Sequence, residues 1–76
     1  MQSLDSLMPG KPARITTLRL DPSDSERLAA FGLVSGTRLE VLRKASLGGP
    51  LQIRLGLTEL MLRRHLAKQI DVEVAV

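Results

Sequence analysis

Residues 38–55 read RLEVLRKASLGGPLQIRL, a pattern of two strands joined by a turn. Apolar and polar side chains alternate in the first part, where Leu39 and Val41 face one side. The same alternation returns in residues 51–55. Between the two runs, residues 45–50 contain a Gly-Gly pair, which can adopt the positive φ of a tight turn. The stretch therefore predicts an antiparallel β-hairpin.

Three further runs show the alternation of half-buried strands. One begins at Ala13 and Ile15, one covers residues 57–62, and the last covers residues 70–76. The segment 63–68 stays ambiguous between an extended piece and a helical turn, since apolar residues recur there at a spacing typical of a helix.

The fold class follows from these short runs. Their connections are too short for parallel crossovers, which favours an antiparallel arrangement. A chain of 76 residues has room for one small domain. The sequence predicts a mainly β fold: a small antiparallel β-barrel of about five strands with one or two short helices, in a single domain over residues 1–76.

One helix is predicted over residues 23–31, where the apolar period changes. Asp21 followed by proline offers a cap and a first-turn residue, and Ser23 with Glu26 fits a capping box. Gly32 supplies a left-handed stop.

Leu28 and Phe31 recur three residues apart on this helix, which predicts that Phe31 lies in the core. Residues 1–12 contain Pro and Gly and read as a turn-rich lead-in. Its apolar side chains can fold back onto the core: Leu4, Leu7 and Met8.

Composition excludes several classes of function. The chain has no cysteine, which rules out disulfides, thiolate zinc sites and iron–sulfur ligation. Its one aromatic residue, Phe31, offers neither a stacking platform for single-stranded nucleic acid nor an aromatic groove for polyproline. The net charge of +3 is ordinary for a soluble surface, and it permits an acidic partner without requiring one.

No segment has the pattern of a membrane span or a secretory signal. The longest run without charged residues, 28–37, is about half as long as a spanning helix needs to be. The N-terminus lacks the basic and apolar regions of a signal peptide. The chain is therefore expected in the cytosol.

No group of residues predicts an enzyme or a firm metal site. His65, the only histidine, has no evident serine and acid partners, and the carboxylates near residue 21 are explained by helix capping. Zinc usually takes about four ligands, most of them His or Cys, and the chain has one histidine and no cysteine. We therefore expect that the protein requires no cofactor. His65 is a weak surface candidate at which a divalent transition metal could bind weakly together with a carboxylate.

What remains is a surface that combines basic and apolar residues. Two basic pairs, at residues 43–44 and 63–64, accompany three apolar side chains that are predicted to point outward or to lie at the hairpin tip. The pattern fits a protein interface or a solvated charged face, and the residues alone leave both open. The predicted partner-binding residues are Leu42, Arg43, Leu47, Gly48, Gly49, Pro50, Met61, Arg63 and Arg64.

Several stretches, in this order and spacing, resemble the FeoA family, small cytosolic proteins of bacterial ferrous iron uptake. They are FGLVSG at residues 31–36, VLRKASLGGPLQI at 41–53, LMLRR at 60–64, and Ala67 with IDV at 70–72. The resemblance implies an SH3-like β-barrel with added helical segments. It also implies a non-enzymatic role as an accessory to FeoB, the membrane transporter that carries a cytosolic G-protein domain. The family often has proline where this chain has Ser35 and Ser46.

The leading hypothesis is a regulatory protein that docks on that G-protein domain through the hairpin tip and the basic residues beside it. The transporter would recruit the protein to the inner membrane. The alternative is a small basic β-barrel that binds nucleic acid, for which the pI near 10.2 argues. A third hypothesis is a metal sensor or chaperone, and the small number of metal-ligating side chains argues against it.

Overall fold

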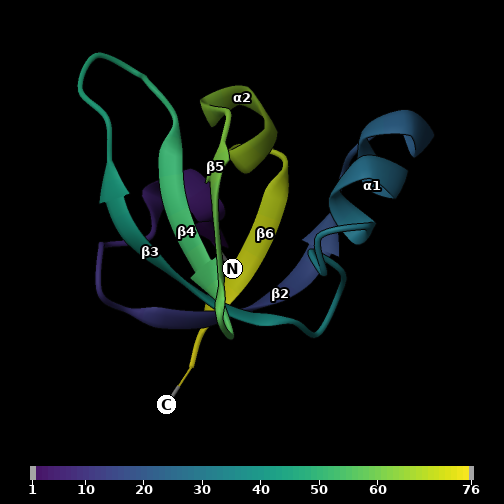
Figure 1. Cartoon of the computed structure of the whole chain (residues 1–76), viewed down its shortest axis with the longest axis horizontal. Coiled ribbons are helices and arrows are strands. Elements are labelled where there is room, and N and C mark those ends of the chain that lie inside the picture. Colours follow the sequence, from purple (N-terminus) through teal and green to yellow (C-terminus); the bar gives the residue numbers. More distant parts are fainter. Residues whose placement is uncertain (1, 76) are drawn as a thin grey trace.

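The computed structural model describes residues 2–75, which form one antiparallel sheet with short helical segments (Figure 1). The strands are β1 (Gln2–Ser3), β2 (Pro12–Leu18), β3 (Arg38–Lys44), β4 (Leu51–Leu55), β5 (Thr58–Leu62) and β6 (Ile70–Val74). The helical segments are the 3-10 helix η1 (Leu4–Ser6), α1 (Pro22–Ala29) and α2 (Arg64–Ala67). The mainly β, antiparallel prediction is confirmed.

The strands follow the order β1-β6-β2-β3-β4-β5. The sheet has six strands rather than about five, because Gln2 and Ser3 pair with Val72 and Asp71 of β6. Val76, predicted to end the last strand, lies outside the described residues. In Figure 1 the β3–β4 hairpin and α1 project on opposite sides of the curled sheet, with β5 and α2 between them.

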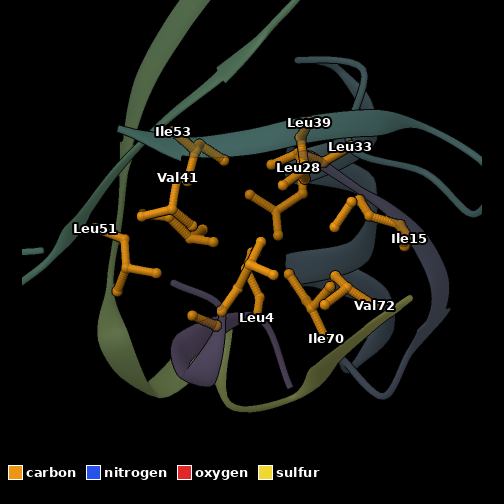
Figure 2. Close-up of a cluster of buried hydrophobic side chains, with 14 residues drawn as sticks. Leu4, Ile15, Leu28, Leu33, Leu39, Val41, Leu51, Ile53, Ile70 and Val72 are labelled. Carbon is orange, nitrogen blue, oxygen red and sulfur yellow. The ribbon is translucent and has the colours of Figure 1, made fainter. Parts of the chain in front are cut away.

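Inward-facing side chains of the strands, the helical segments and two loops fill one hydrophobic core (Figure 2). Its members are Leu4, Leu7, Ala13, Ile15, Leu28, Leu33, Leu39, Val41, Leu51, Ile53, Leu62, Ala67, Ile70 and Val72. Leu4 and Leu7 fold back onto the core as predicted, whereas Met8 is 66% exposed and the prediction for it is wrong. The Met8 carbonyl accepts the Lys11 N–H (3.2 Å) in a turn that runs over the surface.

The helix α1 begins at the predicted cap. The Asp21 Oδ1 accepts a hydrogen bond from the Asp24 N–H (2.8 Å), and Pro22 occupies the first turn. Ser23 therefore lies inside the helix and not at its cap. The helix starts one residue earlier and ends two residues earlier than predicted.

The end of α1 explains why the prediction for Phe31 is wrong. Gly32 has φ 92° and donates to the Ala29 carbonyl (2.9 Å), while the Leu33 N–H donates to the Leu28 carbonyl (3.0 Å). This Schellman pattern places Leu33 beside Leu28 in the core. Phe31 lies beyond the last helical turn and is 52% exposed.

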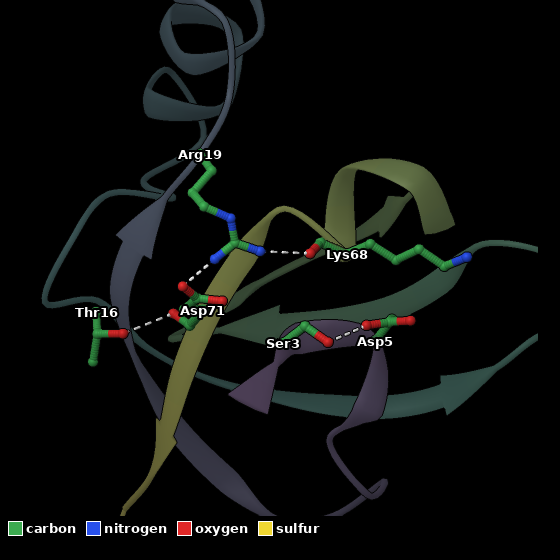
Figure 3. A network of polar contacts seen from close by, with 6 residues as sticks. All are labelled: Ser3, Asp5, Thr16, Arg19, Lys68 and Asp71. Carbon is green, nitrogen blue, oxygen red and sulfur yellow. Dashed lines mark hydrogen bonds and ion pairs between the residues drawn. The ribbon is translucent and has the colours of Figure 1, made fainter. Parts of the chain in front are cut away.

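The segment left ambiguous by the sequence forms α2 at residues 64–67. Polar contacts hold it and β6 against β2 (Figure 3). Arg19 pairs with Asp71 and donates from Nη2 to the Lys68 carbonyl (3.0 Å), and Thr16 Oγ1 donates to the Asp71 carbonyl (3.2 Å). The bond to the Lys68 carbonyl ties the C-terminal end of α2 to Arg19, just beyond β2.

Candidate docking site

The β3–β4 hairpin ends in a tight turn over residues 46–49. The Gly49 N–H donates to the Ser46 carbonyl (3.1 Å), and both central residues have positive φ, 58° at Leu47 and 75° at Gly48. Two successive left-handed residues are characteristic of a type I′ turn. The prediction that the Gly-Gly pair adopts positive φ is thus right for Gly48 and wrong for Gly49, because the other left-handed residue is Leu47.

Gly49 is required for a different reason, which is space. A Cβ atom at Gly49 would lie 2.7 Å from the Ala45 Cβ, so the backbone passes too close for a side chain. Leu47, in contrast, has its side chain fully in solvent, at 104% relative exposure. A left-handed conformation costs a non-glycine residue about 1–2 kcal/mol. The tip therefore displays a leucine at a position that favours glycine or asparagine.

Two cationic side chains hold this hairpin in place. The half-buried Arg64 donates from Nε to the Gly49 carbonyl (3.0 Å) and from Nη2 to the Ala45 carbonyl (3.1 Å). On the other side, Lys44 Nζ donates to the Asp5 carbonyl (2.6 Å). Arg64, one of the predicted partner-binding residues, thus uses its guanidinium to position the tip.

The strand register places other predicted residues in a row across the outer face of the sheet. Arg43 pairs with Gln52, and Gln52 pairs with Met61 on the next strand. Arg43 is exposed, and Met61 is 55% exposed. Leu42 lies at the bulge in β3 and is half-buried, while Arg63 is exposed at the end of β5.

We use the term docking surface for the tip together with the predicted partner-binding residues on the segments beside it. It consists of Leu42, Arg43, Leu47, Gly48, Gly49, Pro50, Met61, Arg63 and Arg64. It combines basic and apolar groups, which suits recognition of another protein.

A second feature was not predicted from the sequence. A cleft of about 230 Å³, here the α1–β5 cleft, opens between α1 and the corner of β5 and α2. Phe31 forms part of one wall, and Leu60 with Met61 forms part of the other. The available signal was Gly32, because a left-handed stop at that residue turns Phe31 away from the core.

His65 is exposed at the border of this cleft. Within residues 2–75, no group of three His, Cys, Asp or Glu side chains is placed to hold a metal ion. A zinc site built from protein side chains needs more ligands than His65 and one carboxylate. In the same residue range, no helix is both long and apolar enough to cross a bilayer.

Known proteins resemble this chain over nearly its whole length. The FeoA domain model matches residues 2–74. The iron(II) transport protein A of Clostridium thermocellum is 37% identical with a TM-score of 0.89, over 96% of this chain and 45% of that chain. The FeoA protein of Chlorobium tepidum is 35% identical with a TM-score of 0.91, over 99% of this chain and 71% of that chain. Among curated proteins, no significant match is found.

A third structure, FeoA of Stenotrophomonas maltophilia, was solved in complex with zinc and is described as an SH3 domain protein. It is 27% identical with a TM-score of 0.77, over 96% of this chain and 91% of that chain. The expected SH3-like fold is thereby confirmed. With the FeoA domain model covering all but the ends of the sequence, the chain belongs to the FeoA family, which is associated with ferrous iron transport.

Proposed function

We propose that this protein is a non-enzymatic accessory of ferrous iron uptake, and that it docks on the cytosolic G-protein domain of a FeoB-type transporter through the docking surface. Membership of the FeoA family, which is associated with ferrous iron transport, supports the first part of this proposal. The proposed location is the cytosol, with recruitment to the inner membrane by the transporter. Nucleic-acid binding is not favoured, since one aromatic residue provides no stacking platform.

The observation that carries this proposal is Leu47. Its side chain is entirely exposed in a left-handed turn that favours glycine, so the folded state of the isolated chain gains nothing from a leucine there. A partner that buries Leu47 would regain the transfer free energy of a large apolar side chain, about 2 kcal/mol. Arg43 and Arg63 nearby add charges that suit an acidic surface on the partner.

No cofactor is part of the proposal. Zinc accompanies the Stenotrophomonas maltophilia protein. In this chain a divalent ion would bind weakly at the surface, at His65 with a carboxylate, and docking would not depend on it.

Calorimetric titration of the full chain with the transporter's G-protein domain tests the proposal, once with GDP and once with a GTP analogue. We expect binding whose affinity differs between the two nucleotides. Leu47→Asp should weaken it at least about 30-fold, because it removes a central apolar contact and places a charge there. Leu57→Asp is the matched control, since Leu57 is equally exposed in the other hairpin. No binding with either nucleotide, or normal binding by a folded Leu47→Asp variant, would contradict the proposal.

A further inference from the structure

The α1–β5 cleft combines apolar walls with a basic rim. Phe31 is 52% exposed and Met61 is 55% exposed, while Leu60, which also lines the cleft, is half-buried and packs against the core. Arg27 and Arg63 line the same cleft and are exposed. Large exposed apolar side chains gathered around one cleft are typical of a contact site for another chain.

The charges around the cleft are unbalanced. Within residues 2–75 the ion pairs form elsewhere, and neither Arg27 nor Arg63 takes part in one. Asp24, in the first turn of α1, is the one carboxylate among the lining residues, and His65 also lies there. Two guanidinium groups against one carboxylate leave a net positive rim, which favours an acidic ligand.

The cleft borders β5, an edge strand of the sheet. β5 is the last strand, and a two-residue turn at Gly56–Leu57 joins it to β4 with Leu55 and Thr58 as the closing pair. Hydrogen-bonded pairs alternate along an antiparallel ladder, starting from the closing pair of such a turn. The peptide N–H and C=O groups of Glu59 and Met61 therefore point away from β4.

We propose that the α1–β5 cleft binds an extended acidic segment of a partner protein, which adds to β5 as a further strand. Main-chain hydrogen bonds to Glu59 and Met61 hold the segment, and one of its apolar side chains enters the cleft. An acidic residue next to that side chain meets Arg27 or Arg63. The Glu59 carboxylate, which accepts from Gln52 Nε2 (3.0 Å), repels acids at the far end of β5, so the acidic residue lies at the α2 end.

This inference goes beyond the docking proposed above, because it does not depend on which protein supplies the segment. Its test uses the full chain and no transporter domain, so the two proposals fail separately.

Selection of random heptapeptides displayed on phage against the immobilised full chain tests the chemistry of the ligand. We expect enrichment of peptides in which Asp or Glu adjoins a large apolar residue. The double variant R27E/R63E should bind the selected synthetic peptide at least about tenfold more weakly. Lys11→Glu is the control, because Lys11 is exposed but does not line the cleft, and it should change the affinity by less than about twofold.

A second pair of variants tests the strand addition. Met61→Pro removes the outward N–H and leaves the ladder to β4 intact, since edge strands accept proline where the N–H faces away from the sheet. Met61→Ala removes the same side chain but keeps the N–H. The selected peptide should bind the proline variant about tenfold more weakly than the alanine variant, a loss equal to one or two hydrogen bonds.

N-methylation of the peptide gives the same test on the unaltered protein. Methylation of an amide that faces β5 should abolish binding, and methylation of the next amide should not. Selection of basic or proline-rich peptides, no enrichment at all, or equal binding by the two Met61 variants with equal effects of both methylations would each overturn the proposal. So would dimerisation of the chain through β5, measured by light scattering and by disulfide crosslinking of a variant with one cysteine introduced on β5, since the occupant would then be a second copy.

Discussion

The two hairpins of the sheet end in leucines that are equally exposed but held differently. Leu47 in the β3–β4 turn and Leu57 in the β4–β5 turn both have a relative exposure of 104%. In the β4–β5 turn the left-handed residue is Gly56, with φ 60°, and Leu57 keeps a negative φ. In the β3–β4 turn the left-handed residue is Leu47 itself, with φ 58°.

The difference shows that exposure alone does not mark a docking residue. Leu57 fits its turn without strain, and single exposed leucines are common. Leu47 lies in a conformation that costs about 1–2 kcal/mol, in a hairpin that Arg64 supports with two hydrogen bonds. A strained leucine on a fixed support indicates a role outside the fold of the isolated chain.

The largest change in stability is expected when the β3–β4 hairpin loses the side chain that supports it. Arg64→Ala should lower the free energy of unfolding by about 2 kcal/mol, because the Ala45 and Gly49 carbonyls lose a charged donor. Urea denaturation followed by circular dichroism measures it. Arg63→Ala is the control, since Arg63 is exposed, and it should stay within about 0.5 kcal/mol. Equal losses in the two variants would show that Arg64 is not a support.

A smaller loss of stability is expected from substitutions of the turn glycines, and it should differ between the two hairpins. Gly49→Ala should destabilise the protein by about 1.5 kcal/mol, because the added Cβ would lie 2.7 Å from the Ala45 Cβ. Gly56→Ala meets no atom within 4 Å and should cost only the strain of its positive φ, about 1 kcal/mol. Thermal unfolding of both variants ranks them, and the reverse order would contradict the close approach at Gly49.

The smallest effect has the opposite sign. Leu47→Asn should raise the free energy of unfolding by about 0.5–1 kcal/mol, because asparagine tolerates the left-handed conformation better than leucine. Leu57→Asn should change it by less than about 0.5 kcal/mol. In the calorimetric titration, Leu47→Asn should weaken docking although it stabilises the fold. If both variants behave alike in both measurements, the two hairpins are equivalent and the comparison fails.

Features that depend on local chemistry were predictable from the sequence. The Asp21 cap and the Gly32 stop of α1 follow from side-chain and backbone properties of single residues, and both are present. The exchange of Phe31 for Leu33 in the core was missed, because it depends on where the last helical turn ends. A shift of two residues in that end reverses which of the two side chains faces inward.

The site was predictable only in part, for a related reason. The hairpin tip was visible as a Gly-Gly pair between alternating runs. The Arg64 bonds, however, join residues 15 and 19 positions apart, and the α1–β5 cleft joins Phe31 to Leu60. Such contacts depend on the path of the whole chain, and no periodicity or spacing in the sequence reports them.

The pairing of β1 with β6 also bears on how the protein is made. Gln2 pairs with Val72, and Leu4 and Leu7 enter the core from a segment that precedes every long strand. On a translating ribosome the first residues must therefore wait for β6 to leave the exit tunnel before the core can close. Contacts so distant in sequence slow folding and delay it until residues 70–74 have emerged. Until then the apolar N-terminal segment stays exposed to chaperones and proteases.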